Sequence, residues 1–541
     1  MHNIYEKRIS LNNVMLMVMT LAFSGVASAG SPDRFEAHMN LLASDLLAGR
    51  DTGSIGHDFT ALYIASELQK YGVKPAGNDN SYYQNIPFKQ STIDPKSPKL
   101  SVSNGDKTIE FSFMNDMLMS PDINQTDSQL EGELVFTGFG IDAPFLNYSD
   151  LDDIDVKGKI AVIMFAMPKH FPSEEGAHYW RKSVDALTER GAIGIISVHN
   201  PEIEKIFPFE VRKMYARVAA TKWVHPNGDV HNARPELRNY ATLNMEAGKK
   251  LFALAGMDIQ VIFDDIANNK KPKSKVMGLT AKASVKSTHS ETQSPNVIGV
   301  LEGSDPVLKN EYVILTAHSD HIGISKHSVK KDKINNGAMD NATGVSTLLE
   351  IAYELHTAKK RPKRSIIFAF VTGEEKGLLG SDYYAHYPTV PIKQIVANVN
   401  LDMPILTYRT GEMVAFGAQH SSLKSSVTQA LNQHQIKLVP DPMPEQAIFV
   451  RSDQYSLVKK GVPAVYLKPG AKESGSNKEM VSHDVFRKQH YHQPSDDLNL
   501  PIDYEWAAKF VDINLAIAES IANTEQTPAW NEDSFFKTFA K

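Results

Sequence analysis

The sequence has 541 residues, a formal net charge of −6 at pH 7 and no cysteine. At roughly 150 residues per domain, this length predicts two to four domains. The mildly acidic charge gives no electrostatic reason to expect nucleic-acid binding. The lack of cysteine excludes disulfides and thiolate ligands, so any bound metal must be held by His, Asp and Glu side chains.

The first 29 residues have the pattern of a secretory signal peptide. Lys7 and Arg8 form a basic region, an apolar run follows over 14–26, and Ala27-Ser-Ala29 is a small-x-small cleavage site. The apolar run is too short to span a bilayer. We therefore expect a signal peptide over 1–29 and export to the periplasm or the extracellular medium, with no stable membrane insertion after cleavage.

Residues 36–50 and 57–72 are predicted to form two amphipathic helices. In the second, apolar side chains follow helical spacing, and Gly72 ends the pattern. The apolar face consists of Phe59, Leu62, Tyr63, Ala65, Leu68 and Tyr71. We assign residues 30–125 to the first part of a catalytic domain.

From about Leu130 the chain carries short apolar runs that are typical of buried strands, with a helix over 183–190. The strands are expected at 133–136, 160–164 and 193–197. The stretch 266–295 is rich in Lys, Ser and Thr, and we interpret it as an edge strand with linkers that marks a boundary. Residues 126–290 are therefore assigned to a smaller, β-rich α/β domain inserted into the first.

The rest of the chain alternates strands with helices, which predicts a mostly parallel, helix-covered sheet and an α/β fold. Strands are expected at 296–301, 312–317, 365–371, 395–401, 413–416 and 463–467. Helices are expected at 344–357, 422–434 and 503–524. Residues 291–525 form the second part of the catalytic domain, and 526–541 form a C-terminal tail.

Acidic and imidazole side chains follow several of these strands directly. His318 and Asp320 come after strand 312–317, Glu374 and Glu375 after 365–371, and Asp402 after 395–401. In an open α/β sheet, functional groups gather outside the carboxyl ends of the strands. We therefore expect these side chains to meet at one edge of the sheet, together with Asp340, which precedes a helix, and His492.

This set contains the groups that a two-metal hydrolytic site needs. Two Zn²⁺ ions, three ligand carboxylates and a bridging hydroxide sum to zero charge, and paired metals acidify the shared water. Glu374 and Glu375 are adjacent in a turn, so one can bind metal while the other carries a proton. The carboxylate of Asp320 can accept the second ring N–H of His318 and fix its tautomer.

Each of these residues also has an ordinary structural interpretation. Asp340 could cap the helix that begins near Gly344. The pair Glu374 and Glu375 could be surface charge, and His492 carries little information by itself. The order of the residues and their placement at strand ends favour the metal site.

Five runs resemble the secreted di-zinc aminopeptidases of metallopeptidase family 28. They are 316–321 (TAHSDH), 337–345 (GAMDNATGV), 373–381 (GEEKGLLGS), 400–403 (NLDM) and 491–496 (YHQPSD). The opening run 42–50 is similar to that family's first helices. The middle region, with 158–162 and 191–195, resembles the protease-associated (PA) domain that is often inserted there.

The resemblance implies two zinc ions per chain that are bridged by Asp340. His318 and Asp402 would complete one zinc site, and Glu375 and His492 the other. It further implies that Glu374 is the general base and that Asp320 supports His318. It also implies a cis peptide bond after Asp340 and a cleft lined by Ser452 and Asp453. Tyr491 is a candidate to stabilise the oxyanion, and a packing aromatic is an equal alternative.

The sequence therefore predicts an exported zinc-dependent aminopeptidase that acts on peptides through a metal-bridged hydroxide. Cobalt and manganese remain alternatives, because a site of nitrogen and oxygen ligands discriminates weakly among these metals. A carboxypeptidase or dipeptidase would need cations for the substrate carboxylate, and Arg451 and the lysines of 326–333 are candidates.

Four further interpretations fit less well. A glutaminyl-cyclase-like enzyme is a further alternative on this fold, though one zinc would need fewer ligands. A non-catalytic binding protein should have lost ligands, and none is missing. Serine hydrolases and zincins are disfavoured because the sequence has neither G-x-S-x-G nor H-E-x-x-H.

Overall fold

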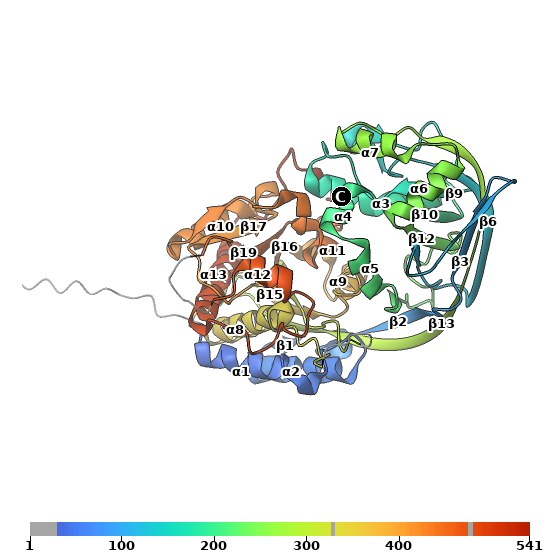
Figure 1. Cartoon of the computed structure of the whole chain (residues 1–541). Coiled ribbons are helices and arrows are strands. Elements are labelled where there is room, and N and C mark those ends of the chain that lie inside the picture. Colours follow the sequence, from blue (N-terminus) through green and yellow to red (C-terminus); the bar gives the residue numbers. More distant parts are fainter. Residues whose placement is uncertain (1–29, 326–330, 474–479, 541) are drawn as a thin grey trace, which may run out of the picture.

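The computed structural model describes the protein over residues 30–325, 331–473 and 480–540. These residues form two lobes that two long strands connect (Figure 1). The strands are β2 (Tyr83–Ile93) and β13 (Lys275–Leu301). We call residues 94–286 the small lobe and the other described residues the large lobe. The expected signal peptide, residues 1–29, lies outside the described residues.

The sheet of the large lobe is mixed, and its centre is parallel. In spatial order the central strands are β15 (Ser365–Val371), β14 (Tyr312–His318), β16 (Ile395–Asn400) and β19 (Ala464–Pro469). On one side β13 pairs antiparallel with β15. On the other side lie β17 (Glu412–Phe416), antiparallel to β19, and β18 (Lys437–Val439). The expected α/β fold with a mostly parallel sheet is confirmed.

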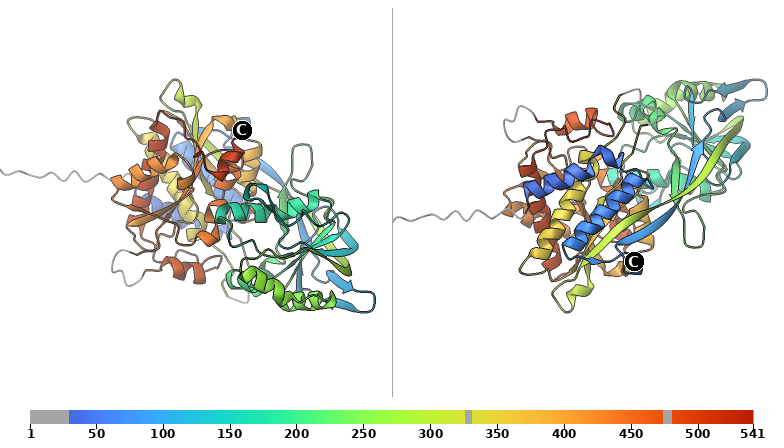
Figure 2. Two further views of the ribbon diagram at one scale, coloured as in Figure 1. Left: turned by 90° about the horizontal axis from the view of Figure 1, so that it is seen from above. Right: turned by 90° about the horizontal axis from the view of Figure 1, so that it is seen from below.

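Helices cover both faces of this sheet. One face carries α1 (Pro32–Leu42), α2 (Ile55–Lys70), α8 (Thr343–Thr357), α10 (Leu423–Gln433) and α13 (Tyr504–Asn523). Figure 2 shows α1 and α2 beside α8 on this face. The other face carries α9 (Leu379–His386) and α11 (Gln454–Val458). None of the helices in the described ranges has the length and apolar character that a membrane crossing requires.

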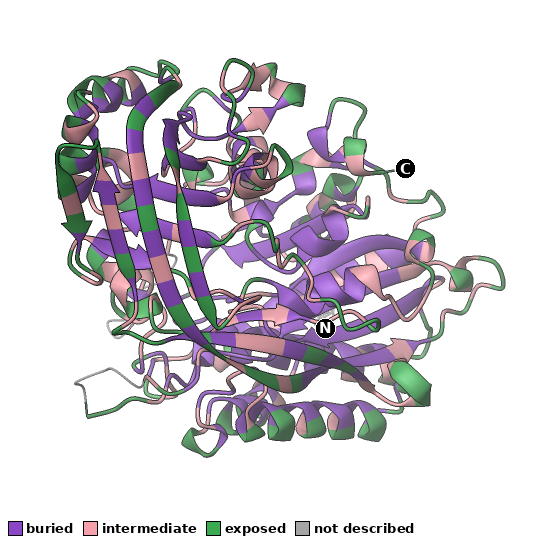
Figure 3. Ribbon diagram, turned by 90° about the vertical axis from the view of Figure 1, so that its right-hand side faces the viewer, coloured by how far each residue is buried: buried purple, intermediate pink, exposed green. Residues whose placement is uncertain are grey.

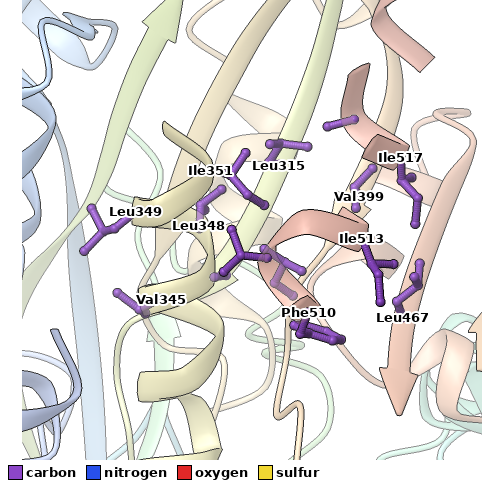
Figure 4. Close-up of a cluster of buried hydrophobic side chains, with 14 of the residues drawn as sticks. Leu315, Val345, Leu348, Leu349, Ile351, Val399, Leu467, Phe510, Ile513 and Ile517 are labelled. Carbon is purple, nitrogen blue, oxygen red and sulfur yellow. The ribbon is translucent and has the colours of Figure 1, made fainter. Parts of the chain in front are cut away.

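The core between α8, α13 and the sheet holds the large lobe together (Figure 4). Strand residues such as Leu315 and Val399 pack against Leu348 of α8 and Ile513 of α13, and all are at most 1% exposed. Burying each such side chain contributes about 1.5–3 kcal/mol. This packing fixes the strand ends, and with them the positions of any side chains that follow the strands.

Local sequence explains where the first helices begin and end. The Ser31 hydroxyl accepts a hydrogen bond from the Arg34 amide, and serine is a favoured residue at this capping position. Pro32 occupies the first turn of α1, where proline is favoured because its missing N–H has no helical partner to lose. The expected helix over 36–50 is shorter, because α1 ends at Leu42 and only a 3₁₀ turn, Asp45–Leu47, follows. Helix α2 starts behind the Ser54 cap, close to its expected position.

The interpretation of 266–295 as an edge strand with linkers is wrong. Residues 275–301 form one continuous strand, β13, which pairs with β2 and β15 in the large lobe and with β3 and β6 in the small lobe. Over 277–288 its residues alternate between buried and more exposed positions, as the colouring of the long strands in Figure 3 shows. The Lys side chains and most of the Ser and Thr side chains that looked like linker composition lie on the exposed face of this part, whereas Ser287 and Ser294 are buried.

The small lobe has its own sheet and core. Its strands are β3 (Lys99–Ser103), β4 (Thr108–Phe111), β5 (Met117–Met119), β6 (Asp127–Phe136), β9 (Ile160–Met164), β10 (Gly194–Val198) and β12 (Asn239–Leu243). Its helices are α3 (Ser173–Glu189), α4 (Pro201–Ile206), α5 (Phe209–Tyr215), α6 (Met245–Leu254) and α7 (Ile259–Ala267). Strands β3 to β6 share one core, so the expected boundary at residue 126 falls inside this lobe.

Short strands and the chain end complete the fold. They are β1 (Lys74–Pro75), which pairs with β13, the hairpin β7 (Asp142–Ala143) and β8 (Tyr148–Ser149), and β11 (Ala220–Trp223), which pairs with β2. Helix α12 (His483–Gln489) precedes α13. In the segment expected to be a tail, Trp530, Phe535 and Phe536 are buried against Phe449.

Candidate metal centre

The acidic and imidazole residues singled out from the sequence meet at the carboxyl ends of the central parallel strands. His318 is the last residue of β14, and Asp402 lies two residues beyond the end of β16. Glu374 and Glu375 occupy the turn after β15, and Asp340 lies just before α8. Parallel strands end at one edge of a sheet, so side chains that are far apart in sequence converge there.

His318 forms the first half of the cluster. Its Nε2 lies 3.2 Å from Oδ1 of Asp340 and 3.4 Å from Oδ1 of Asp402. The ring is 1% exposed. Its Nδ1–H donates to the main-chain carbonyl of Asp320 at 3.1 Å, which leaves Nε2 facing the two carboxylates. The orientation is the one that a metal-binding imidazole needs.

His492 forms the second half, on the opposite side of Asp340. Its Nε2 lies 3.3 Å from Oδ2 of Asp340 and 3.1 Å from Oε2 of Glu375. Nδ1 of His492 is hydrogen-bonded to the hydroxyl of Tyr215 at 3.2 Å. Tyr215 is the last residue of α5 in the small lobe. The two oxygens of Asp340 therefore face two different imidazoles, as a bridging carboxylate would.

His321 belongs to this second half, and the sequence analysis gave it no role. Its Nδ1–H donates to Oε1 of Glu375 at 2.7 Å. Its ring is fully buried, and it offers a ligand atom within 4.8 Å of those of Asp340 and Glu375. The sequence did hold a signal for it, because His321 lies three residues after His318 at the same strand end, inside the run 316–321.

The residues present fit a metal ion. Among the described residues, Nε2 of His318, His321 and His492 is buried and makes no hydrogen bond, although carboxylates surround it. An unsatisfied buried polar group costs about 1–3 kcal/mol. Imidazole nitrogens and carboxylate oxygens are the ligands that Zn²⁺ accepts in a protein without cysteine. A cation between these groups would satisfy the nitrogens and offset the carboxylate charge.

Asp320 has a different partner from the one expected. Its Oδ1 lies 3.8 Å from Nδ1 of His318, which is beyond hydrogen-bond distance, so the main-chain carbonyl rather than the carboxylate contacts the ring. The carboxylate accepts from the amides of Glu374 and Glu375, at 3.2 and 3.4 Å, and from the Thr52 hydroxyl at 3.1 Å. Asp320 thus holds the turn that carries both glutamates.

Asn341, rather than Asp340, performs the capping role that the sequence left open. Its Oδ1 accepts from the amide of Gly344 at 3.0 Å and from the amide of Met403 at 2.9 Å. The peptide bond between Asp340 and Asn341 is cis, as the family resemblance implied. The carboxylate of Asp340 is therefore free of capping duties and faces the two imidazoles.

Asp496 and Arg50 support the Asp340 turn from a distance, and both were missed. Asp496 is fully buried and accepts from the amides of Met339 and Asp340, at 2.8 and 3.1 Å. Burial raises the pKa of Asp496 to about 7, and the nearby Asp340 adds to this shift. Arg50 is 1% exposed and donates to the main-chain carbonyl of Gly337 at 3.1 Å. Neither contact follows from local sequence spacing.

The two adjacent glutamates have opposite protonation tendencies. Burial raises the pKa of Glu374 well above its usual range, and the carboxylates of Asp402 and Glu375 add to the shift. Burial acts in the same direction on Glu375, but His492 and His321 outweigh it and lower the pKa of that carboxyl. Neighbouring acids whose pKa values are pushed apart suit different roles, one as a ligand and one as a proton carrier.

Tyr491 and the Ser452–Asp453 pair lie around the cluster. The Tyr491 ring stacks on His492 with centroids 3.9 Å apart, and burial raises the pKa of its hydroxyl, so the phenol stays neutral. The Ser452 hydroxyl accepts from the side chain of Asn400 at 2.9 Å. Asp453 is fully buried, which raises its pKa to about 7.

Part of the chain is similar in sequence to known peptidases. Residues 296–518 match the sequence profile of Peptidase family M28. The chain is 33% identical to aminopeptidase NAALADL1 of Mus musculus over 138 residues, which are 25% of this chain and 17% of that protein. It is 27% identical to aminopeptidase Y of Saccharomyces cerevisiae over 237 residues, 42% and 38% of the respective chains. The matches therefore span less than two fifths of these relatives' lengths.

Structural similarity extends further along the chain than sequence similarity. The aminopeptidase from Aneurinibacillus sp. strain AM-1 aligns over 94% of this chain and 97% of its own, with a TM-score of 0.53 and 18% identity. At this identity the alignment establishes a common fold. That fold includes both lobes, because the aligned share exceeds the large lobe alone.

Proposed function

We propose that the protein is a zinc-dependent aminopeptidase that removes N-terminal residues from peptides, because residues 296–518 match the model of Peptidase family M28. One observation carries the proposal: the two oxygens of Asp340 each face a buried imidazole nitrogen that makes no hydrogen bond among the described residues. The matches in sequence to aminopeptidases of mouse and yeast support cleavage at the N-terminus of the peptide rather than at its C-terminus.

The ligand sets follow from the contacts. His318, Asp340 and Asp402 would hold one zinc ion, and Asp340, Glu375 and His492 would hold a second. When bound, zinc lowers the pKa of a coordinated water to near 7 and polarises a carbonyl oxygen. The three carboxylates balance most of the charge of two ions, which suits a buried site.

Glu374 is the proton carrier in this proposal. It lies outside both ligand sets, and the hydrogen bond from its amide to Asp320 fixes its position beside them. Its raised pKa allows it to take a proton from the attacking water and to deliver that proton to the leaving amine. Tyr491, which stays neutral, can donate a hydrogen bond to the developing oxyanion.

We further propose that the chain is exported and that the small lobe is a protease-associated domain. Export rests on the basic, apolar and small-x-small pattern of residues 1–29. N-terminal sequencing of secreted or periplasmic protein should find Gly30 as the first residue. The domain proposal rests on the small lobe's own sheet and core, inserted between β2 and β13.

The decisive experiment combines metal analysis with a matched peptide panel. Purified protein should contain two zinc ions per chain and should cleave peptides with free N-termini but not their N-acetylated forms. A chelator should remove both the metal and the activity, and added Zn²⁺ should restore them. Cleavage of acetylated peptides at the same rate would contradict an aminopeptidase, and a metal-free active protein would contradict the metal centre.

A further inference from the structure

The first residues that the structure describes are held in place by the helices of the large lobe. Gly30 is buried, and its main-chain N–H donates to Oδ1 of Asp512 on α13 at 2.8 Å. The amide of Ser31 donates to Oε2 of Glu350 on α8 at 3.1 Å. Chain ends are poorly ordered unless specific contacts hold them. Two carboxylates from two different helices therefore fix the chain just before α1.

Gly30 also packs very closely against α13. A Cβ atom at this position would lie 2.5 Å from the carbonyl oxygen of Ala508 and 2.9 Å from its Cα atom. Protein interiors are packed too densely to accept such an overlap, so glycine is the residue that fits here. Asp512 lies four residues after Ala508 and hence on the same face of α13. Packing as well as the hydrogen bond thus places the main-chain nitrogen of Gly30 beside the Asp512 carboxylate.

Three carboxylates lie around the start of α1. Arg34 of α1 pairs with Glu350 at 2.9 Å and with Glu354 at 2.6 Å, and Asp512 is the third acid. Burial raises the pKa of Glu354, and repulsion from Glu350 and Asp512 adds to this shift, although Arg34 opposes it. A further positive charge at this place would reduce the repulsion among the carboxylates.

We propose that removal of the signal peptide supplies this charge, because it converts the main-chain nitrogen of Gly30 into a terminal ammonium that forms an ion pair with Asp512. The inference rests on the proposed export and on the small-x-small pattern of residues 27–29, which places the cut before Gly30. Hydrolysis of that peptide bond consumes one water, leaves a carboxylate on Ala29 and frees the amine of Gly30. A terminal amine has an ordinary pKa of about 7.7–8.0, so it is mostly protonated at pH 7.

The new charge strengthens a contact whose geometry the fold already provides. A chain that still carries residues 1–29 offers Asp512 the neutral amide of Gly30, whereas the cleaved chain offers an ammonium at the same atom. The attraction between opposite charges is then added to the hydrogen bond. Cleavage therefore tightens the docking of α1 onto α8 and α13.

The burial of Gly30 also sets the order of cleavage and docking. A protease cuts an accessible, extended chain, and the bond before a buried glycine is no longer accessible once α1 has packed. The cut therefore comes before α1 docks. Arg50 connects the other end of α1 with the metal centre, because it donates to the main-chain carbonyls of Leu42 and Gly337. The ion pair thus holds the first turn of a helix whose last residue shares Arg50 with the Asp340 turn.

The test compares two zinc-loaded forms of the protein, each with Asp512 and with Asp512→Asn. One form begins at Gly30, and the other begins at Ala27, so that its terminal charge lies three residues away. Hydrogen exchange followed by mass spectrometry measures how often α1 opens. In the form that begins at Gly30, Asp512→Asn should speed exchange over residues 32–42 about tenfold, because a hydrogen bond between charged groups is lost. In the extended form the change should be about twofold at most, because the neutral amide can still donate to the Asn carbonyl.

Two controls separate the terminal charge from other effects on the fold. Glu525→Gln changes a side chain that is 89% exposed just beyond α13, and it should leave the exchange of α1 unchanged in both forms. Exchange over residues 259–267, helix α7 of the small lobe, should be the same in all proteins. Unchanged exchange there verifies that each variant keeps its fold.

Three results would contradict the inference. An equal effect of Asp512→Asn in both forms would mean that Asp512 acts through the amide or through packing. No effect in either form would mean that the contact does not hold α1. Exported protein whose first residue is not Gly30 would remove the ammonium from this place. None of these measurements uses peptidase activity, so a failure here is distinguishable from a failure of the proposed reaction.

Discussion

In the described part of the chain, two clusters of His and acidic side chains have similar distances between their potential metal ligands. One is the metal centre around Asp340. The other joins the two lobes and consists of His231, Asp382 and His386. In both, potential ligand atoms lie within 4.8 Å of one another. The clusters differ in whether these ligand atoms already have hydrogen-bond or ion-pair partners in the chain. A cluster whose atoms lack such partners needs a cation, and a cluster whose atoms are paired does not.

At the interlobe cluster every oxygen of the central carboxylate has a donor. Oδ2 of Asp382 accepts from Nε1 of Trp223 at 3.0 Å and lies 3.2 Å from Nε2 of His231. Oδ1 pairs with the ammonium of Lys459 at 3.0 Å. The Nδ1–H of His386 donates to the main-chain carbonyl of Asp382 itself. A lysine already supplies the positive charge that a metal would bring.

At the metal centre the balance is reversed. Several carboxylates converge, no Lys or Arg of the described residues pairs with Asp340, and three imidazole nitrogens lack hydrogen bonds. The raised pKa of Glu374 has the same origin, because burial and neighbouring carboxylates favour its neutral form. Unsatisfied ligand atoms, more than their proximity, therefore identify the functional cluster.

The largest expected effect tests this distinction directly. Asp340→Ala removes the carboxylate shared by both halves of the centre, so the protein should lose both zinc ions and all peptidase activity. Asp382→Ala removes the centre of the other cluster and should keep both zinc ions. Metal content is measured by mass spectrometry after dialysis. Full zinc occupancy in Asp340→Ala would refute the bridging role.

The next effect concerns Glu374. Glu374→Gln keeps the shape of the side chain but cannot carry a proton, so kcat should fall by about 10²- to 10⁴-fold. Zinc content should stay unchanged, because Glu374 lies outside the ligand sets. Glu445→Gln, on the surface, is a matched control. Activity within a few-fold of the unaltered enzyme would remove Glu374 from its role.

A substitution in the interlobe cluster should change the stability of the protein rather than its activity. Burial opposes ionisation of Asp382, but His231 and Lys459 outweigh it and hold its pKa well below the usual range. A lowered pKa stabilises the folded state above the ordinary Asp pKa of about 4, and this contribution is lost as the pH falls. Asp382→Asn should therefore lower the free energy of unfolding by about 2 kcal/mol at pH 7.

Urea unfolding at pH 7 and at pH 3, below the ordinary Asp pKa, checks this expectation. The difference between Asp382→Asn and the unaltered protein should shrink at the lower pH, where part of the ionic contribution is lost. Asp533→Asn, an exposed carboxylate near the chain end, should show no such difference at either pH. A difference that does not depend on pH would mean that Asp382 acts through packing alone.

Much of the large lobe could be predicted from the sequence, because its buried strands are short apolar runs between helical patterns. Strand 365–371 begins and ends as expected, and helix 344–357 differs by one residue. The site residues at strand ends could be predicted for the same reason, since the strand fixes where the next side chain lies. The interpretation of β13 failed because a strand shared by two sheets has one polar face.

Residues that act across large sequence distances could not be predicted. Arg50 and Asp496 hold the Asp340 turn from opposite ends of the chain, and no spacing rule connects them with it. Asp320 was expected to contact His318 with its carboxylate, but its amide partners follow from the path of a turn that only the structure reveals. Contacts that hold the site residues in place from distant parts of the chain depend on tertiary structure.

Substitution of Tyr215 is expected to have the smallest effect. In each cluster the outer nitrogen of a histidine contacts a side chain of the small lobe: Nδ1 of His492 contacts Tyr215, and Nδ1 of His231 contacts His225. The partner behind a metal-bound imidazole tunes metal affinity about 10- to 100-fold. Because Tyr215 is 41% exposed, Tyr215→Phe should weaken zinc binding by only about tenfold.

A chelator competition titration measures this affinity, with Tyr240→Phe on β12 as the control in the same lobe. The loss should affect one of the two zinc ions, because His492 contacts Glu375 and Asp340 but not Asp402. Unchanged affinity for both ions would mean that the small lobe leaves the centre untouched. A one-ion effect would show that the insert helps to build the metal site that the large lobe provides.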